Sequence, residues 1–176
     1  MATVVLTGFM GTGKTRIGER LAQRLERPFV DTDSLIEQRE GCSVAAIFAA
    51  AGEAHFRAAE RRAVAEACAM ADAVIATGGG AIMDPDNRAA LRAAAPIVCL
   101  TARPAVILAR ATRAGASRPL LQDDDPTARI AALLAERADA YAQADLTLDT
   151  SDRRIDDLVA DIEAFLRTHP RREEQP

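Results

Sequence analysis

The chain has 176 residues, 49% of them hydrophobic and 27% charged, with a formal net charge of -4. This length and composition are typical of a single globular domain, expected at residues 1–168, followed by a disordered tail at 169–176. The acidic balance, with arginines and acids scattered along the chain, argues against a nucleic-acid binder, and no run of about 18 apolar residues offers a membrane span.

Apolar strand-like runs alternate with helical patterns along the whole chain. The apolar runs predict short strands at Thr3 to Thr7, Phe29 to Asp31, Ala73 to Ala76, Ile97 to Leu100 and Leu146 to Leu148. The helical patterns include Lys14 to Leu25, Ser34 to Glu40, Thr127 to Gln143 and Ile155 to Leu166. Such alternation predicts an α/β domain with a mainly parallel sheet whose strands are buried.

The first predicted strand is followed by GFMGTGKT, residues 8–15, which matches the phosphate-loop pattern GxxxxGK[ST] between a strand and a helix. Glycines let backbone N–H groups surround phosphate oxygens, and the helix N-terminus adds positive charge. The alternative is a glycine-rich turn that only joins strand to helix. The nucleotide contacts expected from this segment are Gly11, Thr12, Gly13, Lys14, Thr15 and Arg16.

Lys14 is the only lysine in the chain. A lysine ammonium is a compact charge on a thin stem that fits inside a closed backbone loop, whereas the guanidinium of arginine is a flat, wide fork. We therefore expect the geometry of the loop to require lysine here. The NKxD segment with which guanine-specific GTPases recognise their base needs a second lysine, so ATP is the expected phosphoryl donor.

The second predicted strand ends in two carboxylates, Asp31 and Asp33. The carboxyl ends of parallel strands face the ligand crevice of such a sheet. Phosphoryl transfer needs Mg²⁺ and an acceptor hydroxyl held in line, and one carboxylate can serve each purpose. The alternative is that Asp33 is only the N-cap of the next helix, which would not explain Asp31.

The third predicted strand leads into Gly78, Gly79 and Gly80. Together with the phosphate loop, this triplet contains six of the ten glycines in the chain. Glycines at a strand end allow a ligand to touch the main chain directly, although a flexible turn is an equal alternative for the triplet alone.

The motifs together resemble the shikimate kinase family in order and spacing. They are GFMGTGKT, DTD, GExxFR at residues 52–57, the glycine triplet and RPLL at residues 118–121. The resemblance implies a three-layer P-loop kinase fold, in which helices flank a five-stranded parallel sheet. It also implies a helical substrate-binding region at about 32–61 and a mobile lid at about 112–126. The implied reaction is ATP-dependent phosphorylation of the 3-hydroxyl of shikimate, in aromatic amino-acid biosynthesis.

The same resemblance implies roles for individual residues. Asp33 is the expected base for the attacking hydroxyl, Thr15 and Asp31 are the expected Mg²⁺ ligands, and Lys14 and Arg118 are the expected cations on the phosphates. The expected shikimate-binding residues are Asp33, Phe48, Phe56, Arg57, Gly78, Gly79, Gly80 and Arg137. Arg110, Arg154 and the segment 149–154 are expected near the adenine.

Arg137 is also singled out by its helical pattern. It shares a face with Ile130, Leu134 and Tyr141, where an unpaired charge would be costly, so an anionic partner is expected. That partner could be a protein carboxylate, or the side chain could extend to solvent. The segment Glu136 to Tyr141 departs from the RxPLY pattern of the family, which leaves altered substrate preference open.

The remaining expectations concern the environment of the protein. Cys42, Cys68 and Cys99 show no CxxC spacing, which indicates free thiols and a reducing compartment. The N-terminal residues carry no basic leader, so we expect a cytoplasmic monomer that binds shikimate and Mg-ATP. Two alternatives are a P-loop kinase for gluconate or a nucleoside monophosphate, and an ATP-binding regulator without catalysis.

Overall fold

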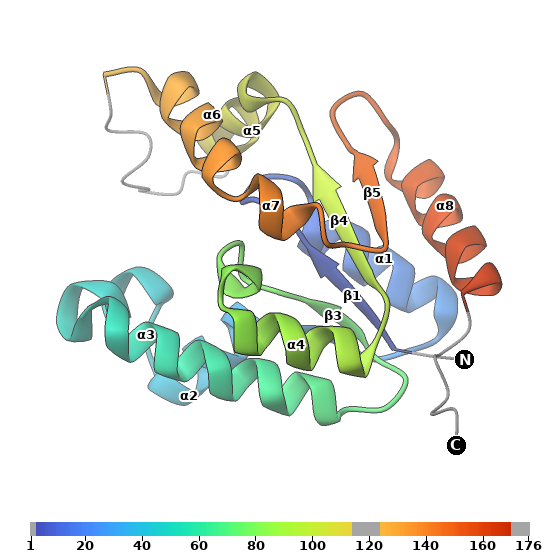
Figure 1. The fold of residues 1–176 in the computed structure, drawn as a ribbon, viewed down its shortest axis with the longest axis horizontal. Helices are drawn as coiled ribbons and strands as arrows, with labels where there is room; N and C mark the ends of the chain where they lie inside the picture. The colour runs from blue at the N-terminus through green and yellow to red at the C-terminus, as the bar shows by residue number, and fades with distance from the viewer. Residues whose placement is uncertain (1–2, 114–123, 170–176) are drawn as a thin grey trace.

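A computed structural model describes residues 3–113 and 124–169 of the chain. Five parallel strands form one sheet in the order β2-β3-β1-β4-β5 (Figure 1). The strands are β1 (Val4–Thr7), β2 (Phe29–Asp31), β3 (Val74–Ala76), β4 (Ile97–Thr101) and β5 (Leu146–Asp149). Each predicted strand is present to within one residue at either end, and the predicted α/β fold class is confirmed.

Helices connect the strands and cover both faces of the sheet (Figure 1). They are α1 (Lys14–Leu25), α2 (Thr32–Glu40), α3 (Val44–Ala69), the 3-10 turn η1 (Ala81–Met83), α4 (Pro85–Ala94), α5 (Pro104–Arg113), α6 (Pro126–Glu136), α7 (Ala138–Tyr141) and α8 (Ile155–Thr168). None of the helices in the described ranges is long and apolar enough to cross a membrane.

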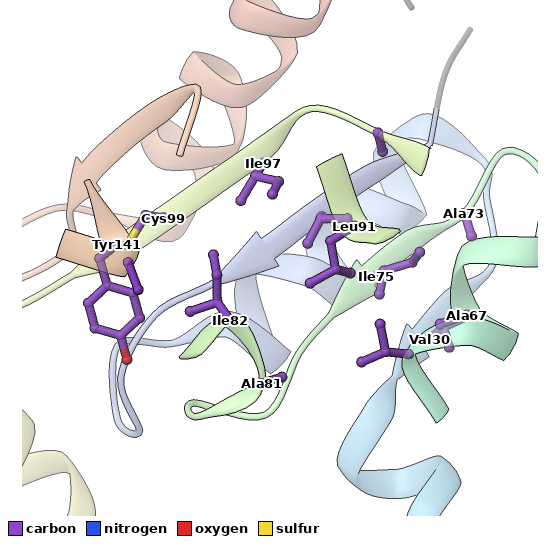
Figure 2. Packing of buried hydrophobic residues seen from close by; sticks show 14 residues of the cluster. Val30, Ala67, Ala73, Ile75, Ala81, Ile82, Leu91, Ile97, Cys99 and Tyr141 are labelled. Atoms are coloured by element: carbon purple, nitrogen blue, oxygen red, sulfur yellow. The ribbon is translucent and has the colours of Figure 1, made fainter. Parts of the chain in front are cut away.

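Alternate strand residues point to opposite faces, and both faces are apolar because both are covered. Val5, Ile75 and Ile97 lie on one face, in a buried cluster with residues of α3, α4 and α7 (Figure 2). Val4 and Leu6 lie on the other face, in a second cluster with residues of α1 and α8. The sheet is therefore the rigid middle layer that holds the ends of its strands in place.

Helix α1 lies close to the sheet because of its sequence. Ile17 and Leu21 are one turn apart and buried, and the intervening Gly18 lies so close to Phe29 that a Cβ at Gly18 would be 2.4 Å from the Phe29 Cε2 atom. The helix begins at Lys14, as predicted. This contact fixes the direction in which the phosphate loop enters α1.

The start of α2 differs from the prediction. The helix begins at Thr32, and its N-cap is Asp31, whose Oδ1 atom accepts hydrogen bonds from the N–H groups of Asp33 at 3.0 Å and Ser34 at 3.4 Å. The alternative that made Asp33 the N-cap is therefore wrong. The carboxylate at the strand end is the one that reaches the free N–H groups of the first turn.

The helix predicted at Thr127 to Gln143 is interrupted. Arg137 has φ -99° and ψ -2°, which ends α6 and separates it from the short α7. The chain changes direction at this residue, and α7 contacts η1 beside the glycine triplet. The predicted single helix is wrong because this tertiary contact, which periodicity does not encode, sets the direction of α7.

Candidate active site

The motifs of the sequence meet at the carboxyl edge of the sheet. The phosphate loop follows β1, Asp31 ends β2, and the glycine triplet at residues 78–80 follows β3. These three strands are neighbours in the order β2-β3-β1. Parallel strands bring their ends to one edge, so the segments lie together although they are far apart in the sequence.

Backbone geometry that favours glycine shapes the phosphate loop. Gly8 has φ +134°, and a Cβ there would lie 2.1 Å from the carbonyl oxygen of Leu100. The Nζ atom of Lys14 donates to the carbonyl oxygens of Gly8 at 2.8 Å and Phe9 at 3.0 Å. The ammonium thus lies within the loop that precedes its own helix, as a thin side chain can and a guanidinium cannot.

A cavity of about 480 Å³ opens beside the phosphate loop. Four arginines contribute to its lining: Arg16, Arg110, Arg113 and Arg153. The lining also includes Gly11, Thr12, Gly13, Ile17, Thr150, Ile155 and Leu158. Clustered guanidinium groups next to a phosphate loop suit a polyanionic ligand, and the apolar residues provide a surface for a flat ring.

Arg110 connects two walls of this cavity. Its guanidinium donates to the carbonyl oxygen of Gly11 at 3.2 Å, to the hydroxyl of Thr150 at 2.9 Å and to the carbonyl oxygen of Thr150 at 2.6 Å. Arg154 is exposed at the N-cap of α8 and is not part of the lining, whereas its neighbour Arg153 is. Sequence reasoning named segment 149–154, which contains Arg153, but singled out its neighbour Arg154. It missed Arg113, which belongs to no distinctive motif.

Two oxygen ligands suitable for Mg²⁺ lie side by side at the start of α1. The hydroxyl of Thr15 donates to the Oδ2 atom of Asp31 at 3.1 Å, while the other oxygen of Asp31 caps α2. Mg²⁺ is commonly held by one or two protein oxygens together with phosphates and water, so this pair fits. No group of three or more acidic, histidine or cysteine side chains that could hold a metal occurs in residues 3–113 and 124–169.

Asp33 lies between the phosphate loop and the glycine triplet, and its environment disfavours the charged form. Burial, and next the charge of Asp31, raise the pKa of Asp33 from 3.8 to about 6, while the charge of Lys14 partly opposes them. Its Oδ1 atom is buried and accepts no hydrogen bond from the described residues. A Cβ at Gly78 would lie 2.6 Å from this atom. Asp33 therefore has one buried oxygen that no described residue satisfies.

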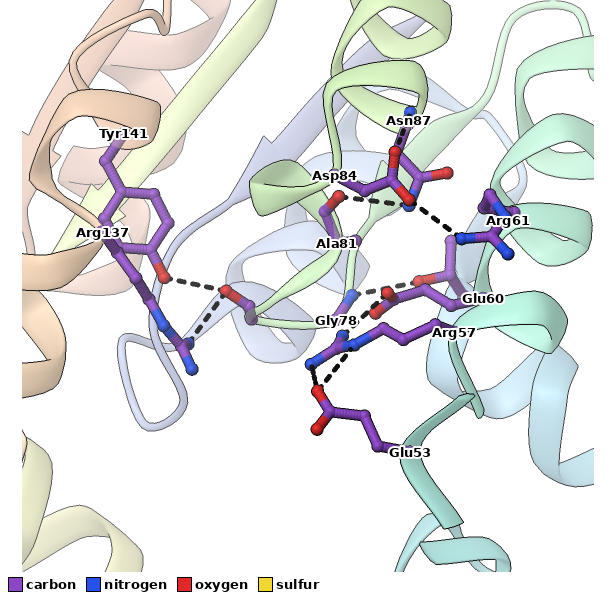
Figure 3. A network of polar contacts seen from close by, with 12 residues as sticks. Glu53, Arg57, Glu60, Arg61, Gly78, Ala81, Asp84, Asn87, Arg137 and Tyr141 are labelled. Atoms are coloured by element: carbon purple, nitrogen blue, oxygen red, sulfur yellow. Dashed lines mark hydrogen bonds and ion pairs between the residues drawn. The ribbon is translucent and has the colours of Figure 1, made fainter. Parts of the chain in front are cut away.

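Hydrogen bonds from three elements hold the glycine triplet. The N–H of Gly78 donates to the hydroxyl of Thr32 at 3.0 Å. The carbonyl oxygen of Gly79 accepts from Arg137 at 3.2 Å and from the hydroxyl of Tyr141 at 2.9 Å (Figure 3). The N–H groups of Gly79 and Gly80 have no acceptor within the described part of the chain, so both are available as donors.

Arg57 approaches the triplet from α3. It forms ion pairs with Glu60 at 2.9 Å and Glu53 at 3.1 Å (Figure 3), and a Cβ at Gly80 would lie 3.0 Å from its Nη1 atom. Glu60 is only 1% exposed, and burial raises its pKa more than the hydrogen bond from Arg57 lowers it. Arg57 and Glu60 are an i,i+3 pair on α3, and the buried carboxylate orients the guanidinium.

Arg137 enters the site from the opposite side of the triplet (Figure 3). Its guanidinium lies 5.0 Å from the centre of the Phe9 ring, a cation–π distance. None of the ion pairs among the described residues includes Arg137. The partner that it contacts is the neutral carbonyl of Gly79, which leaves an anion from outside the protein as the expected charge partner.

Two aromatic side chains border the substrate side of the site. The rings of Phe48 and Phe56 are 4.5 Å apart, with Phe56 buried and Phe48 39% exposed. Gly52, with φ +78°, breaks the helical geometry of α3 between them. This kink lets both rings share one small apolar surface next to Arg57.

The remaining expected residue, Arg118, lies outside the described residues, as does most of the expected lid. The flanking parts of that segment are the end of α5 at Arg113 and the start of α6 at Pro126. Its Asp125 caps α6 by accepting a hydrogen bond from the N–H of Ala128 at 3.0 Å.

Known proteins resemble this chain over nearly its whole length. The family profile described as Shikimate kinase matches residues 10–167. A shikimate kinase from Geobacter metallireducens is 47% identical over 93% of this chain and 90% of that protein. One from Symbiobacterium thermophilum is 49% identical over 90% and 92%. A solved structure, shikimate kinase from Acinetobacter baumannii in complex with shikimate, has a TM-score of 0.90 at 34% identity, covering 97% of this chain and 95% of that one.

Proposed function

The chain belongs to the shikimate kinase family and transfers the γ-phosphoryl group of ATP to the 3-hydroxyl of shikimate, and we propose that the residues at the carboxyl edge of its sheet carry this reaction. The observation that supports the assignment best is the buried carboxylate of Asp33 between the Lys14 loop and the glycine triplet. Family membership disfavours the two alternatives, a gluconate or nucleoside-monophosphate kinase and a noncatalytic regulator.

In the proposed mechanism Asp33 acts on the acceptor. Its carboxylate accepts a hydrogen bond from the 3-hydroxyl of shikimate and takes the proton as that oxygen attacks phosphorus. The new O–P bond forms while the bond from the γ-phosphorus to the β,γ-bridging oxygen breaks, and ADP leaves. A pKa of about 6 leaves Asp33 ionised at neutral pH and still basic enough to accept the proton.

On the nucleotide side of the site, residues act by placing positive charge and hydrogen-bond donors around the phosphates of ATP. Lys14 and the N–H groups of Gly11, Thr12 and Gly13 hold the β- and γ-phosphates, and Arg118 approaches the transferred group from the lid. Thr15 and Asp31 hold Mg²⁺, which neutralises phosphate charge when bound. Arg16 and the cavity that Arg110 braces accommodate the nucleotide, and Arg154 completes the proposed nucleotide set.

Shikimate is an anion with three hydroxyls, and the acceptor side offers a matching set of groups. Arg57 and Arg137 bind the carboxylate of shikimate. Glu60 orients the guanidinium of Arg57, and Arg137 has no ion pair within the described residues. The Gly79 and Gly80 N–H groups donate to ring hydroxyls, and Gly78 leaves room for Asp33. Phe48 and Phe56 cover the apolar edge of the ring.

Several features of the working protein belong to the same proposal. Residues 1–168 form one domain, in which about 32–61 bind shikimate and about 112–126 act as a lid. Of the tail expected at 169–176, His169 stacks on Phe165, and residues 170–176 lie outside the described residues. The protein acts as a cytoplasmic monomer without nucleic-acid partners, which the negative charge and a site built from one chain support. Light scattering at working concentration would test the monomer.

A coupled ADP-release assay tests the proposed function. With Mg-ATP, shikimate is expected to accelerate ADP release far above the rate without acceptor, while quinate, gluconate and nucleoside monophosphates have little effect. The assay also tests substrate preference, since residues 136–141 depart from the family pattern. A preference for another acceptor, or no acceleration by any, would contradict the proposal.

The pH dependence of turnover should report the ionisation of Asp33. Because its pKa is raised to about 6 and the base must be ionised, kcat/KM for shikimate should be constant above pH 7. It should fall about tenfold for each pH unit below 6. Initial rates from pH 5 to 8, with the coupling enzymes in excess at every pH, provide the measurement.

Neighbouring acids could produce a similar acid limb, so a second variant separates them. Glu60 and Glu37 both raise the pKa of Asp33 by their charge, after burial and Asp31. Glu60→Gln should reduce kcat/KM at every pH but keep the limb, moved slightly to lower pH by the lost negative charge. A flat wild-type profile between pH 5 and 8, or a limb that disappears in Glu60→Gln, would refute the role of Asp33.

A further inference from the structure

Tyr141 is the only tyrosine in the chain, and it links the core to the glycine triplet. Its side chain is 7% exposed and belongs to the buried cluster on the α7 side of the sheet, together with Ile82 and Cys99 (Figure 2). At the other end of the ring, the hydroxyl donates to the carbonyl oxygen of Gly79 at 2.9 Å (Figure 3). A rigid, anchored ring thus holds a single backbone carbonyl.

The direction of that carbonyl determines the direction of the next N–H group. The peptide bond between Gly79 and Gly80 is trans, so the carbonyl oxygen and the Gly80 N–H lie in one plane and point in opposite directions. The carbonyl faces Tyr141 and Arg137. The N–H therefore faces away from them, and Gly80 itself lies against the guanidinium of Arg57.

Glycines do not restrict this peptide by themselves. A residue without a Cβ samples both signs of φ, so a Gly-Gly peptide can rotate unless a contact holds it. The contacts that hold the Gly79 carbonyl are the two donors, Tyr141 and Arg137. The turn bond from the Ala81 N–H to the Gly78 carbonyl oxygen, 3.1 Å, closes the backbone around this peptide, and within that turn the two side chains select the direction of the Gly80 N–H.

The two donors are not equivalent. Arg137 is proposed above to bind the carboxylate of shikimate, and a carboxylate competes strongly with a neutral carbonyl for a guanidinium. The tyrosine hydroxyl is neutral, so a substrate carboxylate attracts it less than it attracts the guanidinium that lies beside it. Burial raises the pKa of Tyr141, which keeps the hydroxyl protonated and able to donate. When Arg137 turns to the substrate, Tyr141 remains on the carbonyl.

We propose that Tyr141 is a positioning residue for the acceptor substrate. Its hydroxyl holds the peptide between Gly79 and Gly80 so that the Gly80 N–H faces shikimate, and it frees Arg137 to bind the substrate carboxylate. The inference rests on the proposed shikimate site. It assigns Tyr141 a role in substrate binding without direct contact with the substrate.

Tyr141→Phe removes the hydroxyl and keeps the buried ring. The KM for shikimate should rise about three- to tenfold, the usual effect of one lost hydrogen bond, while kcat and the KM for ATP stay within about twofold. The dissociation constant of shikimate, measured by calorimetry without nucleotide, should rise by the same factor. A residue needed only for packing would change the melting temperature without this selective change in KM.

Thr3→Val serves as the matched control. Thr3 is also buried, and its hydroxyl donates to the carbonyl oxygen of Met70 at 3.4 Å, at the amino end of β1 far from the triplet. Its loss should reduce stability and leave the KM for shikimate unchanged. An equal increase in KM in this variant would attribute the effect of Tyr141→Phe to stability alone and overturn the inference.

Arg137→Met separates failure of the inference from failure of the proposed site. It should raise the KM for shikimate about a hundredfold, because a charge-assisted pair is lost. If Arg137→Met has this effect and Tyr141→Phe leaves KM and the dissociation constant unchanged, the role of Tyr141 is refuted and the site stands. If neither variant changes the binding of shikimate, both the inference and the proposed site are wrong.

Discussion

Asp33→Asn is expected to reduce kcat about a thousandfold while the dissociation constant for Mg-ATP stays within about twofold. The amide cannot take the proton of the attacking hydroxyl, yet it has almost the shape of the carboxylate. The nucleotide cavity is lined by other residues, so ATP binding should survive. Single-turnover rates and nucleotide calorimetry on the same preparation would measure the two effects separately.

The same variant should change the pH dependence of stability in a definite direction. The native pKa of Asp33 is raised from 3.8 to about 6, so its contribution to stability is full below pH 3.8 and is lost as the pH rises through 6. Ionised Asp33 then costs on the order of 2–3 kcal/mol, a cost that asparagine does not have. The stability of Asp33→Asn relative to wild type should therefore increase between pH 4 and pH 7.

Asp157→Asn is the appropriate control for both measurements. Asp157 is an exposed residue in the first turn of α8 and is not among the residues that line the nucleotide cavity, so its replacement should leave turnover unchanged. If the Asp33→Asn variant retained more than about a tenth of the wild-type kcat, Asp33 would be ruled out as the base. Equal unfolding free energies of Asp33→Asn and wild type at every pH would contradict the burial of its charge.

Lys14→Arg is expected to reduce kcat at least about a hundredfold although it conserves the charge. The ammonium lies within the loop and donates to the carbonyl oxygens of Gly8 and Phe9. A guanidinium is wider and planar, so it would either displace the loop or leave it. In both cases the positive charge would no longer lie where the β- and γ-phosphates bind. Steady-state kinetics at saturating ATP would measure the loss.

Arg24→Lys tests the reciprocal exchange on the same helix. Arg24 lies on the outer surface of α1 and pairs with Glu163 at 2.7 Å, so the exchange should leave kcat and both KM values unchanged. If Lys14→Arg kept wild-type kcat, the geometric reason for the lone lysine would have to be abandoned.

Local patterns were sufficient for much of the fold. Short apolar runs predicted each strand to within a residue, and the phosphate-loop motif predicted that α1 starts at Lys14. These features depend on neighbours in the sequence. Glycine permits the turn, and apolar residues that recur with the period of a strand or a helix determine which of its faces is buried. The resemblance to a family then identified the reaction, because several motifs in a fixed order are far more specific than any one of them.

Prediction failed where a distant contact decided the local conformation. The cap of α2 is Asp31 and not Asp33, because the end of β2 brings the first carboxylate to the N–H groups. The helix containing Arg137 breaks where the chain turns towards Gly79, 58 residues earlier in the sequence. Neither residue type nor spacing encodes such a contact.

The sequence by itself determined the phosphate loop, the two carboxylates at the end of β2 and just after it, the glycine triplet and the family, because these depend on residue identity and short spacing. Only the tertiary structure decided which of these groups meet and how they are charged. The raised pKa of Asp33 needs burial and a neighbouring carboxylate, and the hydrogen bond from Tyr141 to Gly79 needs α7 packed beside η1. Burial and long-range contact exist only once the sheet has brought its strand ends to one edge.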